Sequence, residues 1–144
     1  MLIVSACLAG IECRYNGEAY TVLQLEEMVR AGKALPLCPE IIGGLATPRA
    51  KAERQGETVV NELGEDVGAQ FTQGAKRAVE IALLVGCRKA ILKAKSPSCG
   101  CGRIYDGTFS GRLIDGDGIF CSLLKAKGIE VWTEEDFAEN GFEA

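Results

Sequence analysis

Short apolar runs alternate with longer amphipathic segments along this chain. Four brief apolar runs typical of buried strands occupy residues 2–6, 34–37, 89–93 and 129–132. From Val67 to Leu83, apolar residues recur three and four positions apart, which predicts a long amphipathic helix that runs to Gly86. The pattern therefore predicts strands and helices in alternation.

Capping residues indicate where the other helices begin and end. Thr21 starts a capping-box pattern, which predicts a helix that Gly32 closes. Asp117 is expected to cap a helix through Lys127, and Thr133 is expected to begin a short terminal helix. Strands that alternate with helices in this way predict a parallel sheet.

Two segments interrupt the alternation and are expected to form hairpins. Residues 48–66 mix charged and β-branched positions, and residues 96–117 contain many glycines. No linker, repeat or composition break divides the chain, so residues 1–144 are expected to form a single domain. The predicted fold is a three-layer, Rossmann-like α/β sandwich with a short, mainly parallel sheet and small hairpins over its carboxyl edge.

Composition narrows the classes of function. The 144 residues are 47% hydrophobic and 25% charged, which is typical of a globular protein and excludes a largely disordered chain. The formal net charge is −4 and the sequence pI is about 5.0, so nucleic acid is disfavoured as the main partner. The absence of histidine excludes Ser-His-Asp and Cys-His catalysis, histidine zinc sites and haem with a proximal histidine.

Cysteine is abundant for a domain of this size. The seven cysteines are Cys7, Cys13, Cys38, Cys87, Cys99, Cys101 and Cys121. The first residues lack the pattern of a signal peptide, and no apolar run is long enough to span a membrane, so we expect a cytoplasmic protein. In a reducing compartment, many cysteines indicate metal binding or catalysis.

Three cysteines directly follow predicted strands. Cys7 comes after the first strand, Cys38 after the second, and Cys99 in the loop after the third. Because the carboxyl ends of parallel strands meet at one edge of the sheet, these three thiols are expected to converge there. The residues alone leave three possibilities open: an iron–sulfur cluster, reactive thiols without metal, and a structural zinc ion.

The remaining cysteines have simpler interpretations. Cys87 and Cys121 lie beside or within apolar helical segments and are most simply small buried side chains. Cys101 is most simply a spare thiol. Cys13 is either a structural thiol or a replacement for one of the three expected ligands.

Several motifs in a fixed order resemble a known family. They occupy residues 5–10, 13–17, 38–40, 43–45, 48–49, 92–100 and 104–109. Together they are similar to the short single-domain family that contains thiouracil desulfurase, and the resemblance covers nearly the whole chain. Ala9 and Asn16 stand where leucine and aspartate are expected, and residues 50–51 replace a proline-containing pair.

The resemblance implies a specific site and reaction. Cys7, Cys38 and Cys99 would hold a [4Fe-4S] cluster with one iron that no protein residue ligates, and the cluster would be lost readily in air. Glu40 would be the catalytic carboxylate, and Ser96 would orient a small thiolated heterocycle such as 2-thiouracil for desulfurisation without redox change. On the residues alone, Glu40 could instead accept amides at a helix start, and Ser96 could be a turn residue before a proline.

Two other functions compete with desulfurisation. One is a non-catalytic iron–sulfur or zinc protein, such as a redox sensor, in which the thiolates only hold metal. The other is a sulfur-transfer enzyme that works through a cysteine persulfide and needs no metal.

Overall fold

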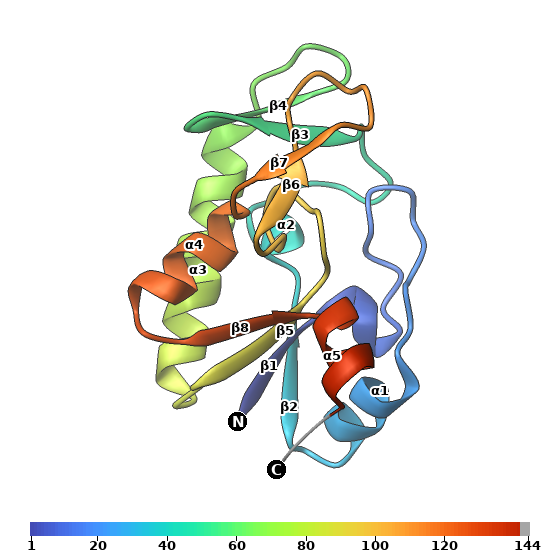
Figure 1. The fold of residues 1–144 in the computed structure, drawn as a ribbon, viewed down its shortest axis with the longest axis vertical. Helices are drawn as coiled ribbons and strands as arrows, with labels where there is room; N and C mark the ends of the chain where they lie inside the picture. Colours follow the sequence, from blue (N-terminus) through green and yellow to red (C-terminus); the bar gives the residue numbers. More distant parts are fainter. Residues whose placement is uncertain (142–144) are drawn as a thin grey trace.

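A four-stranded parallel sheet forms the middle layer between helices in the computed structural model, which describes residues 1–141 (Figure 1). Its strands are β1 (Leu2–Ser5), β2 (Ala34–Leu37), β5 (Lys89–Leu92) and β8 (Glu130–Thr133). They run in the order β2-β1-β5-β8, and each neighbouring pair is parallel. All four strands therefore present their carboxyl ends at the same edge.

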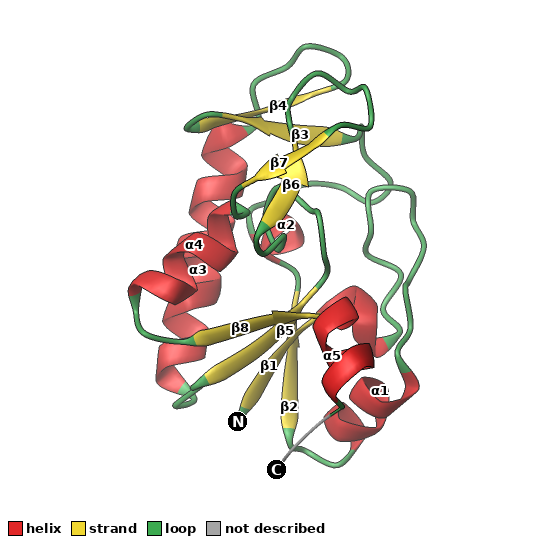
Figure 2. Ribbon diagram, viewed as in Figure 1, coloured by secondary structure: helices red, strands yellow, loops and turns green. Residues whose placement is uncertain are grey.

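Helices cover both faces of this sheet, which confirms the predicted three-layer arrangement. They are the 3₁₀ helix η1 (Ala6–Ala9) and the α-helices α1 (Leu23–Arg30), α2 (Pro39–Ile42), α3 (Gly68–Leu84), α4 (Ile119–Ala126) and α5 (Glu134–Asn140). Helices α3 and α4 lie on one face, and α1 and α5 lie on the other (Figure 2). Side chains alternate accordingly, since Ile3 and Leu92 pack towards α3 and α4 while Val4 and Ile91 pack towards α1 and α5.

Two antiparallel hairpins lie beyond the carboxyl edge of the sheet (Figure 2). They are formed by β3 (Ala52–Gln55) with β4 (Thr58–Asn61), and by β6 (Arg103–Tyr105) with β7 (Leu113–Asp115). The buried side chain of Glu53 joins them, because its Oε1 accepts hydrogen bonds of 3.0 Å from the amides of Gly107 and Phe109. The hairpins expected in residues 48–66 and 96–117 are thus confirmed.

Helix starts agree less well with the sequence-based expectations than strands do. Thr133 begins α5 as predicted, and it caps this helix in a full capping box with Asp136. The predicted box at Thr21 is wrong, because α1 follows Val22 and has no side-chain cap. Asp117 does not cap α4, since its carboxylate accepts instead from the amide of Gly102 and from Lys125. Within residues 1–141, no helix combines the length and apolar character needed to cross a bilayer.

Candidate active site

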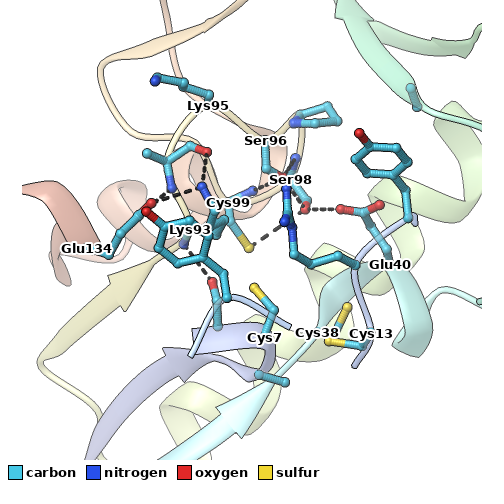
Figure 3. Close-up of a pocket in the computed structure, with 18 of the residues that line it drawn as sticks. Cys7, Cys13, Cys38, Glu40, Lys93, Lys95, Ser96, Ser98, Cys99 and Glu134 are labelled. Carbon is cyan, nitrogen blue, oxygen red and sulfur yellow. Dashed lines mark hydrogen bonds and ion pairs between the residues drawn. The ribbon is translucent and has the colours of Figure 1, made fainter. Parts of the chain in front are cut away.

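A cavity of about 310 Å³ opens at the carboxyl edge of the sheet. Cys7 follows β1, Cys38 follows β2, and Cys99 lies in the loop after β5. All three line this cavity, and their side chains lie around a common space (Figure 3). The convergence expected from parallel topology is therefore confirmed, while the role of these thiols as ligands remains a prediction.

A fourth thiol, that of Cys13, lines the same cavity and is hydrogen-bonded to Cys38. This bond lowers the pKa of Cys38 to about 7, against the effect of burial and with help from the amide of Ile41. Burial raises the pKa of Cys7 to about 12 and also raises the pKa of Cys99. Cys7 and Cys99 therefore keep their protons at neutral pH, and a bound metal would stabilise their thiolates instead.

The distances between the cavity thiols indicate which kind of metal group they could hold. Around one tetrahedral zinc ion, thiolate sulfurs lie about 3.8 Å apart, since each Zn–S bond is about 2.3 Å long. In residues 1–141, three cysteine or carboxylate ligand atoms come within 4.8 Å of one another only at Cys101, Asp117 and Cys121. Among the described residues, no three of the cavity thiols are that close together, and their soft sulfur donors fit a larger iron–sulfur group.

Ser96 organises the loop that carries Cys99. Its Oγ accepts hydrogen bonds of 3.0 Å from the backbone amides of Ser98 and Cys99. The first turn of α4 holds the same loop from the other side, because the amide of Ile119 donates to the carbonyl of Pro97 at 2.9 Å. Lys95, at the start of the loop, has a φ of 72°, a conformation that a residue with a side chain rarely adopts. Such strain is typical of loops that present functional groups.

Glu40 is held in one orientation by two partners. Arg49 donates from Nε to its Oε1 at 3.1 Å, and the guanidinium Nη2 lies 3.1 Å from the same oxygen. Ser98 donates from its hydroxyl to Oε2 at 2.7 Å (Figure 3). The side chains of Glu40 and Arg49 are only 15% and 9% exposed, so solvent screens this pair weakly.

Arg49 also ties the Cys13 segment to the site. Its Nη2 donates to the carbonyl of Cys13 at 2.9 Å, and its own amide donates to the carbonyl of Tyr15 at 2.8 Å. Glu40 is the second residue of the short helix α2, which begins at Pro39. A single guanidinium therefore connects the catalytic candidate to the backbone beside a cavity thiol.

A second buried ion pair forms the opposite wall of the cavity. Lys93 Nζ lies 2.9 Å from an oxygen of Glu134, and the other oxygen accepts from the amide of Ala94. The backbone amide of Lys93 donates to the hydroxyl of Ser5 at 2.9 Å. The ammonium of Lys93 also lies 4.6 Å from the centre of the Tyr20 ring. This wall is thus fixed by hydrogen bonds between the ends of β1, β5 and β8.

Sequence reasoning identified the thiols and Glu40 but missed the partners that orient Glu40. Cys7, Cys38, Cys99, Glu40 and Ser96 all line the one cavity. The hydroxyl that reaches Glu40, however, belongs to Ser98 rather than to Ser96. Both serines stand in the same short motif, and only the folded loop distinguishes them. Arg49 belongs to one of the sequence motifs, but its ion pair with Glu40 could be recognised only in the folded structure.

Known proteins resemble this chain along nearly its whole length. The family model described as 2-thiouracil desulfurase matches residues 2–136. The chain is 42% identical to the uncharacterized protein YbbK of Bacillus subtilis (strain 168), over 94% of this chain and 97% of that protein. It is 48% identical to the solved structure of the [4Fe-4S]-dependent thiouracil desulfidase TudS (DUF523Vcz), with a TM-score of 0.90 over 96% of this chain and 93% of that one. This chain therefore belongs to the 2-thiouracil desulfurase family.

Proposed function

We propose that this protein removes sulfur from a thiolated pyrimidine such as 2-thiouracil, with the help of a [4Fe-4S] cluster and without net redox change. The observation that carries this proposal is the convergence of Cys7, Cys38 and Cys99 on a cavity that also contains the oriented carboxylate of Glu40. The 48% identity to a [4Fe-4S]-dependent thiouracil desulfidase supports the same reaction.

Three of the four cavity thiols would hold the cluster. The proposed ligands are Cys7, Cys38 and Cys99, because each follows a different strand of the central sheet and all three face the same space. Three protein ligands leave one iron of the cluster open. When bound, the cluster would supply a Lewis-acidic iron to polarise the carbon–sulfur bond.

The proposed reaction exchanges one atom for another. A carbon–oxygen bond forms between water and the ring carbon, and the carbon–sulfur bond breaks. The two protons of the water end on the departing sulfur or in solvent, so the products are uracil and hydrogen sulfide. No electrons are gained or lost, and no reductant is required.

Glu40 is the group we assign to proton movement. Arg49 occupies Oε1, and Ser98 donates to Oε2. A carboxylate oxygen accepts two hydrogen bonds, so Oε2 keeps one lone pair for a proton from water. Proton transfer by a positioned carboxylate is suited to a chain without histidine.

Ser96 acts as a positioning residue in this proposal. A hydroxyl has two acceptor lone pairs and one proton, and both acceptors are used by the amides of Ser98 and Cys99. Because Ser98 gives its own proton to Glu40, the 3.0 Å contact between the two serines is donated by Ser96. The proton of Ser96 can instead turn to a bound ring, which is the role that the family resemblance implies.

The physiological setting is part of the same proposal. We propose a cytoplasmic enzyme that acts on a small thiolated heterocycle rather than on nucleic acid. All seven cysteines lie within the described residues and are free thiols, which suits a reducing compartment. The formal net charge of −4 gives no overall attraction to a polyphosphate chain.

The test is product analysis under strict exclusion of oxygen. Protein purified without oxygen is mixed with 2-thiouracil in the absence of reductant, and uracil and sulfide are both measured. We expect the two products in equal amounts over many turnovers. A metal-holding sensor would give neither product, and a persulfide enzyme would keep releasing sulfur after exhaustive iron chelation; either result would refute the proposal.

A further inference from the structure

A second group of metal-binding side chains lies outside the cavity. Cys101 precedes β6, Asp117 follows β7, and Cys121 lies in α4. One ligand atom from each residue lies within 4.8 Å of the other two. None of the three lines the cavity that holds the candidate active site. The sequence alone gave no reason to group them, because the two cysteines are separated by the whole β6–β7 hairpin.

We propose that Cys101, Asp117 and Cys121 bind one zinc ion. Two thiolates and one carboxylate oxygen are a donor set that zinc accepts, and water would complete a tetrahedral site. Around such an ion the donor atoms lie about 3.3–3.8 Å apart, so modest side-chain movement closes the site. Cys121 is fully buried, whereas Cys101 and Asp117 are partly exposed and leave an entry path for the ion.

The charges around this group fit a bound divalent cation. Two thiolates and a carboxylate carry three negative charges, which Zn²⁺ and the ammonium of Lys125 together neutralise. Lys125 Nζ now lies 3.1 Å from both oxygens of Asp117. Its side chain is 43% exposed, so the ammonium can move aside without a large desolvation cost.

A backbone contact already orients the carboxylate. The amide of Gly102 donates to Oδ1 of Asp117 at 2.7 Å, in the manner of the hydrogen bonds that fix ligands around metal sites. The thiol of Cys101 lies 3.7 Å from the carbonyl of Val131 and would give up its proton when it binds the ion. The sulfurs of Cys101 and Cys121 already lie within 4.8 Å of each other.

A metal here would brace the loop that carries Cys99. The N-cap and first turn of α4 already donate backbone hydrogen bonds to this loop, including Gly118 to the carbonyl of Gly100 at 2.7 Å. Gly118 packs so closely that an added Cβ would lie 2.4 Å from the Ser98 backbone. A zinc ion between Cys101 and Cys121 would add a metal cross-link to this contact.

Zinc retention tests the proposal without reference to activity. Cluster-loaded protein, purified without oxygen, is incubated with zinc chloride and passed over a weak chelating resin, after which zinc and iron are measured in the same sample. We expect about one zinc per chain in the wild type, and at least a tenfold loss of retention in Cys101→Ser and Cys121→Ser. Cys87→Ser is the matched control, because this buried cysteine lies outside both groups.

Iron content distinguishes variants that have misfolded from variants that have lost only a zinc ligand. Because Cys121→Ser can fail to fold, the partly exposed Cys101→Ser and Asp117→Asn carry the test, and only samples with wild-type iron content are compared. Equal zinc in these variants and the wild type would overturn the proposal, as would a wild type that retains no zinc. A disulfide between Cys101 and Cys121 in protein kept free of oxygen would overturn it too, in favour of a redox pair.

Discussion

The two ends of strand β5 each have a nearby cysteine in a different environment. Cys87 precedes the strand, packs in the core with α3 and α4, and donates from its thiol to the carbonyl of Lys89 at 3.1 Å. Cys99 follows the strand and faces a cavity that three other thiols and Glu40 also line. Burial raises the pKa of both thiols, so burial alone does not distinguish them.

Strand direction explains the difference between the two cysteines. The carboxyl ends of parallel strands lead into loops from different parts of the chain, and these loops meet at one edge. At this edge the structure keeps buried ion pairs and serine hydroxyls, including Glu40 with Arg49 and Lys93 with Glu134. At the opposite end, Cys87 packs among core side chains and donates a hydrogen bond to the backbone. The same residue type therefore packs among core side chains at one end and lines the candidate active site at the other.

The largest expected effect on activity and iron content distinguishes Cys99 from Cys87. We expect Cys99→Ser to reduce sulfide release from 2-thiouracil to below about 1% of wild type, because a cluster with only two thiolates is poorly held. Cys87→Ser should keep its iron and more than half of the activity. Activity and iron content measured side by side, without oxygen, check this contrast. If both variants lose iron equally, the two ends of β5 do not differ as described.

Glu40→Gln should slow the desulfurisation reaction without loss of iron from the protein. The amide keeps the side chain's size but does not take a proton from water, so we expect turnover to fall about 10²–10⁴-fold. Iron content should match the wild type, because Glu40 is not a proposed ligand. Steady-state rates with iron analysis check this prediction, and a fully active variant would remove Glu40 from the mechanism.

Ser98→Ala should have a smaller effect through the same carboxylate. The variant loses the 2.7 Å hydrogen bond to Glu40, and such bonds to charged groups contribute about 1.5–3 kcal/mol. We therefore expect kcat to fall about ten- to a hundredfold, with KM little changed and the pH profile shifted. Ser122→Ala, at an exposed position on α4, is the matched control. An unchanged pH profile would show that Ser98 does not act through Glu40.

Cys13→Ser tests which of the four cavity thiols hold the cluster. Cys13 is hydrogen-bonded to Cys38 but does not follow a strand of the sheet. We expect Cys13→Ser to keep its iron and to lose less than about tenfold in activity, whereas Cys38→Ser loses both. The reverse result, with iron lost from Cys13→Ser and kept in Cys38→Ser, would exchange the two residues in the ligand set.

The smallest expected effect lies at the start of α3, away from the cavity. Hydrogen bonds from the Gly68 amide and the Thr58 hydroxyl hold the pKa of Asp66 below its ordinary value of 3.8. A lowered pKa stabilises the fold above the ordinary value, and this stabilisation is lost as the pH falls through the folded-state pKa. In urea unfolding at pH 7, the free energy of unfolding should therefore be larger for the wild type than for Asp66→Asn. This difference should shrink below pH 3.8. If the difference in unfolding free energy did not depend on pH, it would come from packing rather than from the charge of Asp66.

Patterns in the sequence were sufficient to predict the sheet and the convergence of three cysteines at its carboxyl edge. Residues 34–37 form a strand with the predicted bounds, and the cysteines after three strands converge as expected. These features depend on local periodicity and on a general rule of parallel sheets, and both can be read without coordinates.

Contacts between distant loops could not be predicted in this way. Helix α2 has only four residues and follows Cys38 directly, so no period reveals it. The hydrogen bonds from Arg49 and Ser98 to Glu40 join residues that are 9 and 58 positions apart in the sequence. The meeting of Cys101 with Cys121 depends equally on how the β6–β7 hairpin returns to α4. Only the packed fold fixes such distances.

The most direct test of the cavity's role is its content of iron and acid-labile sulfide. Protein purified without oxygen is analysed for both elements per chain, together with its visible absorption spectrum. We expect about four iron and four sulfide per chain, with the absorption of a cubane cluster. Neither iron nor sulfide after attempted reconstitution would contradict the proposed [4Fe-4S] site and the desulfurisation that depends on it.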